Sequence, residues 1–400
     1  MIAAEVIDRA RNAKRLLIIA CFGIFCFGIV MALLGAILPI LAKQLSLALG
    51  QVGYLFLTMN FAMMLVMPLL GPLMDQAGMK GILMAGALGT SLALLLIGWS
   101  PTFAVLLASV FLLGAAGSCL NGAANTLVAD LYPDPSRKNS ALNLLGVFFG
   151  FGALSVPFVI GVLLNALPLR SILNLTALLT AALAVACGVP AYPTPKKEGR
   201  IEWRKVGRLV GNPLLLLFGF LLFFESGNEF VIGGYLTTYL SVCLGISISL
   251  ASYLLAAYWG AIMVARILLS RLLLTISGSA LVLICAPAVA ICMVILLSAT
   301  SPVIVSTSII GLGLSLAGIF PTVLGMTGSR FSETPGTAFG LLFTIALAGG
   351  MSMPWVVGQI SASHGLPWGL SLTVANALGI FLLQIFASRR MRLRGKELTR

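Results

Sequence analysis

The chain has 400 residues, of which 60% are hydrophobic and only 9% are charged, and its mean hydropathy is +1.10. A soluble domain carries roughly 25% charged residues, so this chain has too few charges to cover a water-facing surface. Disorder is excluded because disordered chains are poor in apolar residues, and seven cysteines in 400 residues are too sparse for a disulfide scaffold. The remaining class is an integral membrane protein with many spans.

Twelve apolar stretches are long enough to cross a bilayer, for which a helix needs roughly 20 residues. They run apolar without alternation, which favours helices over the strands of a barrel. The first stretch follows a basic segment but is too long for a signal peptide, and we expect it to be retained. In chain order the predicted spans lie near residues 16–42, 50–74, 80–100, 102–130, 139–165, 167–189, 211–240, 248–272, 279–299, 302–328, 337–361 and 366–388.

The basic residues gather on one side of the predicted membrane. With the N-terminus inside, 21 of the 24 Lys and Arg fall on the cytoplasmic side, Lys43 and Arg170 fall outside, and Arg266 lies within a span. Cytoplasmic loops retain Lys and Arg, so we predict a multi-pass protein of the cell (inner) membrane with both termini in the cytoplasm. No aromatic-rich basic groove accompanies the positive charge, and no nucleic-acid partner is expected.

One long polar segment divides the spans into two sets of six. Residues 190–210 contain prolines and six Lys or Arg and predict a cytoplasmic linker between an N-terminal bundle (1–189) and a C-terminal bundle with a basic tail (211–400). At an offset of 197 residues the two halves align without gaps, and such duplication is typical of rocking transporters with a site between the repeats. The matching pairs are Gly114 and Gly311, Ser118 and Ser315, Ala141 and Ala338, Gly152 and Gly349, Ser155 and Ser352, Pro157 and Pro354, and Gly161 and Gly358.

The segment after the second predicted span carries a motif of a known family. Residues 71–80 read GPLMDQAGMK and resemble the loop motif G-x-L-a-D-r-x-G-r-K of the major facilitator superfamily. The matching positions are Gly71, Leu73, Asp75, Gly78 and Lys80, whereas the two arginine positions hold Gln76 and Met79. The glycines permit tight turns and Asp75 can cap a neighbouring helix. The resemblance implies an all-α fold of two six-helix bundles that work by alternating access, with this loop governing conformational change.

Two further segments resemble the fucose/galactose/glucose:proton symporters of that superfamily. Residues 119–128 are similar to the fourth-helix pattern L-E-x-A-A-N-P, and residues 227–239 are similar to the seventh-helix pattern G-x-E-x-x-x-G-x-W-L-x-x-Y. The resemblance implies symport of a hexose-like sugar with an ion. The acid of the fourth-helix pattern is replaced by Asn121 and the first span holds no acid, so coupling through acids of the N-terminal half is not expected.

Glu225 and Glu229 in the seventh predicted span are the candidate ion-coupling residues. They are four residues apart and share one helical face, and ionisable groups inside a membrane are costly and commonly functional. Two close carboxylates suit proton uptake and release, or they can hold Na⁺ together with backbone oxygens. The family resemblance favours Glu229. Arg266, towards the cytoplasmic end of the eighth span, is either a gating residue or a side chain that snorkels to the interface.

Amide side chains within the spans are the candidate substrate ligands, because they both donate and accept hydrogen bonds and suit a neutral polyhydroxy solute. Each of them also suits helix packing. With one aromatic residue that can pack on a sugar ring, the candidates are Asn121, Asn125, Asn228, Asn60, Trp259, Asn376 and Gln359.

The sequence carries no constellation for a cofactor, a zinc site or catalysis. His364 is the single histidine, and no phosphate-binding loop or hydrolase motif occurs. We therefore expect a monomeric, non-enzymatic, H⁺- or Na⁺-coupled transporter of a small neutral solute, most simply a hexose-like sugar, working in the lipid bilayer. The alternative is proton-coupled export of amphipathic, drug-like compounds, which 22 Phe and 15 Met would suit. A non-transporting membrane sensor is the minor alternative.

Overall fold

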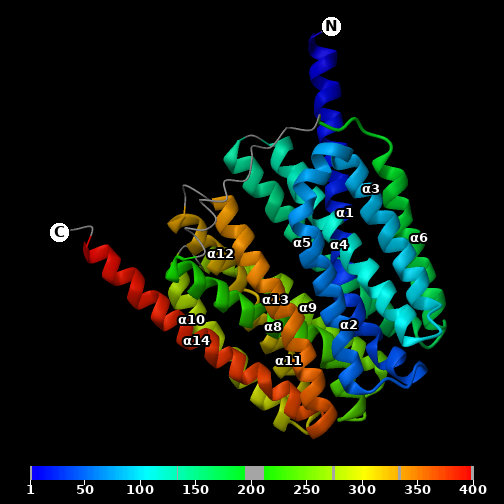
Figure 1. The fold of residues 1–400 in the computed structure, drawn as a ribbon, viewed down its shortest axis with the longest axis vertical. Helices are drawn as coiled ribbons and strands as arrows, with labels where there is room; N and C mark the ends of the chain where they lie inside the picture. Colours follow the sequence, from blue (N-terminus) through cyan, green and yellow to red (C-terminus); the bar gives the residue numbers. More distant parts are fainter. Residues whose placement is uncertain (1, 133, 194–210, 273–274, 332–334, 398–400) are drawn as a thin grey trace. The chain divides into compact units, whose positions relative to one another are not determined.

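The computed structural model describes residues 2–132, 134–193, 211–272, 275–331 and 335–397, and all regular structure within them is helical (Figure 1). Twelve helical segments in this part of the chain are long and apolar enough to cross a membrane. The prediction of an all-α protein with twelve spans is therefore confirmed. Most of the predicted linker, residues 194–210, lies outside the described residues.

The helices of the N-terminal half match the first six predicted spans. The second span is formed by α2 with the 3₁₀ turn η1, and the third lies within α3. The elements are α1 (Ile2–Gln44), α2 (Leu49–Val66), η1 (Met67–Leu69), α3 (Leu70–Gly98), α4 (Phe103–Leu131), α5 (Pro135–Leu163) and α6 (Leu169–Cys187).

The helices of the C-terminal half form the other six spans. The tenth span is broken into two helices, α11 and α12, which meet at Ala317 and Gly318. The elements are α8 (Pro213–Val242), α9 (Ile248–Leu272), α10 (Gly278–Ser298), α11 (Pro302–Leu316), α12 (Ile319–Arg330), α13 (Pro335–His364) and α14 (Leu366–Glu397).

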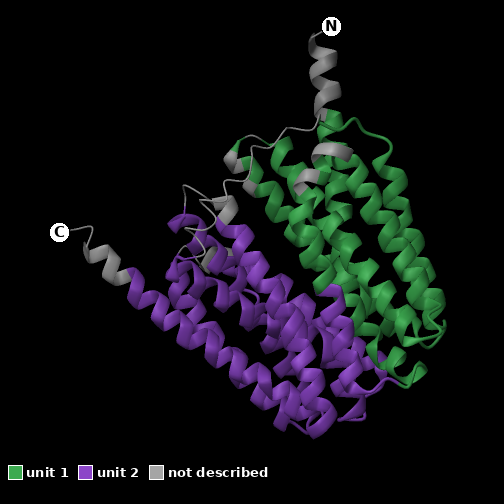
Figure 2. Ribbon diagram, in the orientation of Figure 1, with its two compact units in different colours: residues 1–46, 61–199 green, residues 47–60, 200–400 purple. Residues whose placement is uncertain are grey.

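The chain divides into two compact units (Figure 2). Unit 1 comprises residues 1–46 and 61–199, and unit 2 comprises residues 47–60 and 200–400. The first part of α2 thus packs with the C-terminal helices, for which no signal was found in the sequence. The predicted bundle limits, 1–189 and 211–400, stay a prediction.

Polar residues directly before the helices define several of their starts. Asp134 accepts a hydrogen bond from the Arg137 amide at the start of α5, and Asn212 accepts from the Leu214 and Leu215 amides at the start of α8. Proline follows each of these caps, at a position where its missing N–H costs nothing.

Equivalent glycines mark a very close helix contact in each unit. In unit 1, a Cβ at Gly152 of α5 would meet the backbone carbonyl of Phe25 in α1; in unit 2, a Cβ at Gly349 of α13 would meet that of Phe223 in α8. The two glycines are one of the pairs related by the 197-residue offset. Pro157 and Pro354, a second such pair, both lie inside these same helices.

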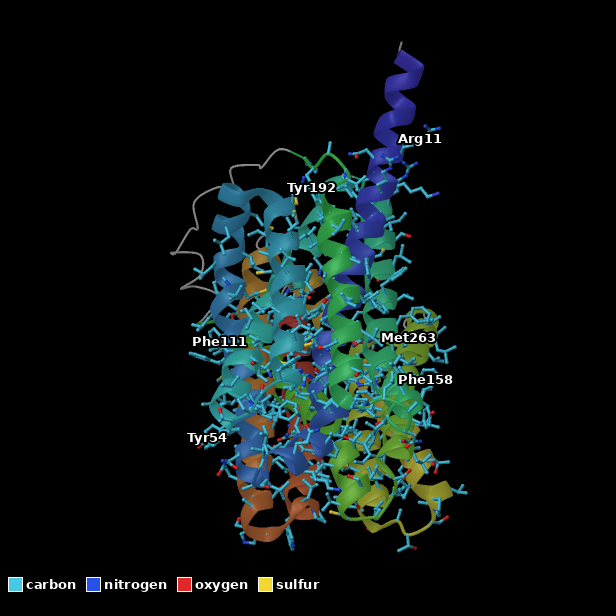
Figure 3. The ribbon with its side chains drawn as sticks, turned by 90° about the vertical axis from the view of Figure 1, so that its right-hand side faces the viewer. Arg11, Tyr54, Phe111, Phe158, Tyr192 and Met263 are labelled. Carbon is cyan, nitrogen blue, oxygen red and sulfur yellow. The ribbon has the colours of Figure 1, made fainter. Side chains whose placement is uncertain are left out.

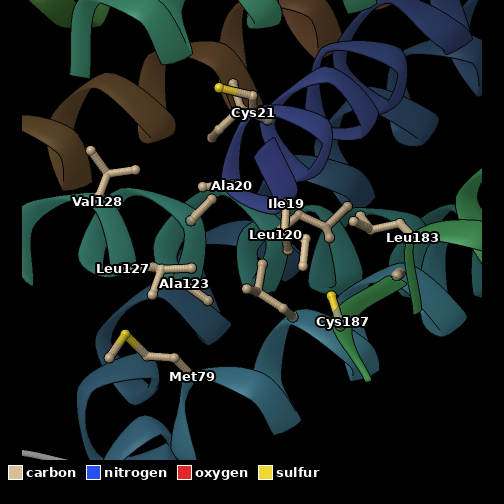
Figure 4. Packing of buried hydrophobic residues seen from close by; sticks show 14 of the residues in the cluster. Ile19, Ala20, Cys21, Met79, Leu120, Ala123, Leu127, Val128, Leu183 and Cys187 are labelled. Atoms are coloured by element: carbon tan, nitrogen blue, oxygen red, sulfur yellow. The ribbon is translucent and has the colours of Figure 1, made fainter. Parts of the chain in front are cut away.

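The core of unit 1 is built from small and branched apolar side chains (Figure 4). Met79 of α3, Leu120 and Leu127 of α4, Leu183 of α6 and Ile19 of α1 are all buried and belong to one apolar cluster. Figure 3 labels Arg11 and Tyr192 at one end of this unit, where Asn12 of α1 donates to the Ala191 carbonyl (2.7 Å) and accepts from the Ala191 amide (3.2 Å). The chain leaving α6 is thereby fixed to α1.

Candidate functional site

Glu225 and Glu229 lie on one stretch of α8 inside unit 2. Glu225 is only 1% exposed and Glu229 is partly buried. The Ser226 hydroxyl donates to Glu225 Oε2 at 3.4 Å. Gly227 brings α8 close to α13, since a Cβ there would lie 2.5 Å from the Met353 side chain. Glu225 is therefore held in a tightly packed part of the unit, and Glu229 lies one helical turn further along.

Two side chains of α9 share the electrostatic environment of these carboxylates. The Arg266 guanidinium attracts both Glu225 and Glu229. Tyr258 lies two helical turns before Arg266, interacts electrostatically with the same three charges, and is fully buried. Its hydroxyl has no hydrogen-bond partner among the described residues. The site thus combines two carboxylates, one guanidinium and one phenol hydroxyl that has no hydrogen-bond partner among the described residues.

A buried amide pair connects α8 to α14 beside Glu229. Asn228 is 0% exposed; its Nδ2 donates to the Thr373 carbonyl at 3.2 Å, and its Oδ1 accepts from Asn376 Nδ2 at 2.9 Å. Both ends of the Asn228 amide are therefore used within the protein. These bonds resist rotation of α8 about its axis and so help to keep the neighbouring carboxylate in place.

The other candidate ligands of unit 2 also make internal contacts. Asn60 Nδ2 donates to the Phe56 carbonyl at 3.0 Å, whereas Asn60 Oδ1 has no partner among the described residues. Gln359 Nε2 of α13 donates to the Gly50 carbonyl at 3.1 Å. Trp259 is buried, and its ring packs against Gly233 of α8. The structure therefore ties these residues to helix packing.

In unit 1 the predicted ligands Asn121 and Asn125 contact each other. Asn125 Nδ2 donates to both the backbone oxygen and Oδ1 of Asn121, each at 2.9 Å. Both side chains are only partly buried, so this pair keeps hydrogen-bonding capacity for another molecule.

The family motif does not form an open loop. Its residues belong to two helical segments of α3 that meet at Gly78, whose φ of 70° and ψ of 161° break the helix. Only glycine adopts such a conformation without strain. Lys80 Nζ donates to the Gly188 carbonyl at 3.4 Å. The Asp75 side chain lies outside the described part of the structure, and the gating role of Gly71, Asp75 and their neighbours stays a prediction.

Sequence reasoning missed the hydrogen-bonding role of Thr373 and Ser226 and the position of Tyr258 beside the two acids. A signal for Tyr258 was present, since Tyr258 and Arg266 are eight residues apart and share a helical face. Thr373 contributes a backbone carbonyl, which no residue type reveals. Among the described residues, no group of three or more His, Cys, Asp or Glu is arranged to hold a metal.

Comparison with known proteins identifies the fold and the sequence relatives. The family model described as Major Facilitator Superfamily matches residues 20–354. The uncharacterized MFS-type transporter YfkL of Bacillus subtilis (strain 168) is 23% identical over 354 residues, which are 86% of this chain and 88% of that protein. The multidrug resistance protein MdtG of Serratia proteamaculans (strain 568) is 31% identical over 214 residues, and this match spans about half (52%) of each chain.

Solved transporter structures share the fold at low sequence identity. The crystal structure of a D-xylose-proton symporter has a TM-score of 0.80 at 13% identity and covers 94% of this chain and 97% of its own. The crystal structure of a mutant of the nucleoside transporter NupG has a TM-score of 0.76 at 15% identity and covers 94% of this chain and 99% of its own. At these identities the likeness concerns the fold alone.

Proposed function

Because the chain belongs to the major facilitator superfamily, we propose that it is an ion-coupled secondary transporter in which the acids of α8 carry the coupling ion. The observation that supports this proposal is Glu225, a carboxyl that is 1% exposed inside a membrane-spanning helix, next to a second acid. A buried charge is costly unless it is paired or neutralised. By taking up a proton the carboxyl becomes neutral, and by releasing it the carboxylate becomes charged and needs a partner.

Arg266 favours H⁺ over Na⁺ as the coupling ion. It attracts both carboxylates, so it competes with any metal cation that approaches them. A proton neutralises a carboxylate by forming a covalent O–H bond, and it needs no coordination space beside Arg266. In the proposed cycle, deprotonated Glu229 is drawn to Arg266 and holds α8 to α9, and protonation of Glu229 releases this attraction. The two protonation states then favour different arrangements of the two helices.

For the substrate, we favour an amphipathic organic compound. Asn228, Asn376 and Asn60 are each at most 2% exposed and make hydrogen bonds within unit 2, which is the behaviour of packing residues. The named drug-resistance relatives support the same choice. A hexose-like sugar is the second candidate, and the partly exposed Asn121–Asn125 pair supports it.

The coupling role is tested with Glu229→Gln and Glu225→Gln, singly and together, in proteoliposomes. Glutamine mimics the protonated acid. We expect Glu229→Gln to abolish accumulation driven by a pH gradient while exchange of labelled for unlabelled substrate continues. Asp134→Asn is the matched control, because asparagine caps a helix as well as aspartate and this carboxylate lies before α5. Gradient-driven accumulation at the wild-type level in the double variant would refute the proposal.

The same vesicles decide between the substrate classes. A lipophilic dye and a panel of hexoses are offered to the wild-type protein under an identical pH gradient. Gradient-dependent movement of the dye, absent from Glu229→Gln, is the expected result. If only a hexose moves, the substrate is a sugar, and the proposal that the acids of α8 carry the coupling ion still stands.

A further inference from the structure

An open groove runs along α1 and α5 in unit 1, on other helices than the acids of α8. Its volume is about 480 Å³, and its lining comprises Lys14, Leu17, Ile18, Cys21, Phe22, Phe25, Leu144 and Phe148. All but the first of these side chains are apolar. From Lys14 to Phe25, α1 rises roughly 16 Å at 1.5 Å per residue, which is comparable to the length of much of an acyl chain.

The wall of the groove contains three phenylalanines that are only partly buried. The Phe22 and Phe25 rings lie 6.1 Å apart on α1, and Phe148 joins them from α5. Ile18 between Lys14 and Phe22 is 58% exposed. The groove therefore presents a continuous apolar surface that the described part of unit 1 does not cover.

The charge at the groove is confined to one end. Lys14 is exposed and is the sole charged residue of the lining, and it lies in the first turn of the part of α1 that is long and apolar enough to cross a membrane, Arg11–Gln44. At the end of a membrane span we expect Lys14 to lie at the level of the polar headgroups, where basic side chains attract anionic lipids. Arg15 is exposed on the same turn but does not line the groove.

We propose that this groove binds one anionic phospholipid. Its phosphate pairs with Lys14, and one acyl chain lies along Ile18, Phe22 and Phe25 against Phe148. A long apolar trough with a single cation at its headgroup end matches an amphipathic anion, and the bilayer supplies that chemistry at high local concentration. The site is independent of the acids of α8 and of the substrate proposed above.

The test uses the full chain in nanodiscs of phosphatidylcholine with increasing phosphatidylglycerol. Retained phosphatidylglycerol is counted by native mass spectrometry, and the thermal unfolding midpoint is recorded in parallel. We expect one retained lipid and a rising midpoint for the wild type. Lys14→Gln should weaken retention about fivefold, the effect of one basic residue near a lipid surface. Arg15→Gln, the matched control with the same lost charge, should retain the lipid.

A second variant tests the apolar part of the groove. Leu144→Trp fills the trough from α5 without changing charge, and it should lower retention even if Lys14→Gln folds poorly. Equal phosphatidylglycerol retention in the wild type, Lys14→Gln and Leu144→Trp would overturn the proposal. So would a midpoint raised by a soluble amphipathic anion in pure phosphatidylcholine but not by phosphatidylglycerol, because the ligand would then come from solution.

Discussion

At the residue scale, the site is organised by amides that bond to each other. Asn228 uses both ends of its side chain on α14, through the Thr373 carbonyl and the Asn376 amide. Its place directly before Glu229 means that a hydrogen-bonded, solvent-free contact supports the residue proposed to carry the proton. Side chains suited by type to a sugar therefore also brace a helix contact here, and their role in substrate binding stays a prediction.

Removing one partner of this pair should destabilise the protein. Asn376→Leu leaves Asn228 Oδ1 buried without its donor, and we expect a loss of about 1 kcal/mol, as for interhelical hydrogen bonds in membranes. The unfolding midpoint in detergent measures it. Asn143→Leu, at an exposed position of α5, should leave the midpoint unchanged. An equal midpoint for both variants would contradict the bracing role of the amide pair.

The candidate site was only partly predictable from sequence. Glu225 and Glu229 could be selected because acids are rare and costly inside spans. The proximity of Arg266 and Tyr258 to them depends on how α9 packs on α8, which no local pattern specifies. The hydrogen bond that the Thr373 carbonyl accepts could not be predicted either, because it depends on how α14 packs on α8.

At the scale of elements, the duplicated halves use glycine for the same purpose. Gly152 lets α5 approach the backbone of α1, and Gly349 lets α13 approach that of α8. Close backbone approach through small residues is a common mode of helix packing in membranes. The repeat that the sequence displays therefore has a structural cause at this pair of positions.

Adding one methyl group at either contact should be costly. Gly152→Ala and Gly349→Ala each force the helices apart, and we expect a loss of about 2 kcal/mol from overpacking. Gly146→Ala and Gly340→Ala are the matched controls on the same helices, because a Cβ at these positions meets nothing within 4 Å. The controls should gain about 1 kcal/mol from helix propensity. If Gly349→Ala is as stable as its control Gly340→Ala, the close-contact account is refuted.

At the scale of the whole molecule, the twelve spans were predictable because a long apolar run is a local signal. The assignment of residues 47–60 to unit 2 was not, because it depends on tertiary contacts. The orientation in the membrane rests on the asymmetry of Lys and Arg and is open to a direct measurement with cysteines.

The native Cys243 provides that measurement. It is exposed directly after α8, on the predicted outer side, and a membrane-impermeant maleimide should label it in intact cells. Although Cys243 is exposed, the protein around its thiol removes part of the solvent and raises the pKa of the thiol above its usual value. Less thiolate is therefore present at neutral pH, and labelling should accelerate as the pH rises. Arg200→Cys in a Cys243→Ser background should label only after the membrane is opened. Labelling of Arg200→Cys in intact cells, with Cys243 protected, would show that the predicted orientation is wrong.

The division of α2 between the units has a consequence for biosynthesis. Phe56 stacks near Tyr235 with ring centroids 5.5 Å apart, and Gly50 receives its hydrogen bond from Gln359, so this part of α2 is made long before its partners. At about 5–20 residues per second, it waits roughly 9–36 s for Tyr235 of α8 to be synthesised and longer for α13. During that interval the polar side chain of Asn60, which is fully buried in the folded protein, lacks the neighbours that later enclose it.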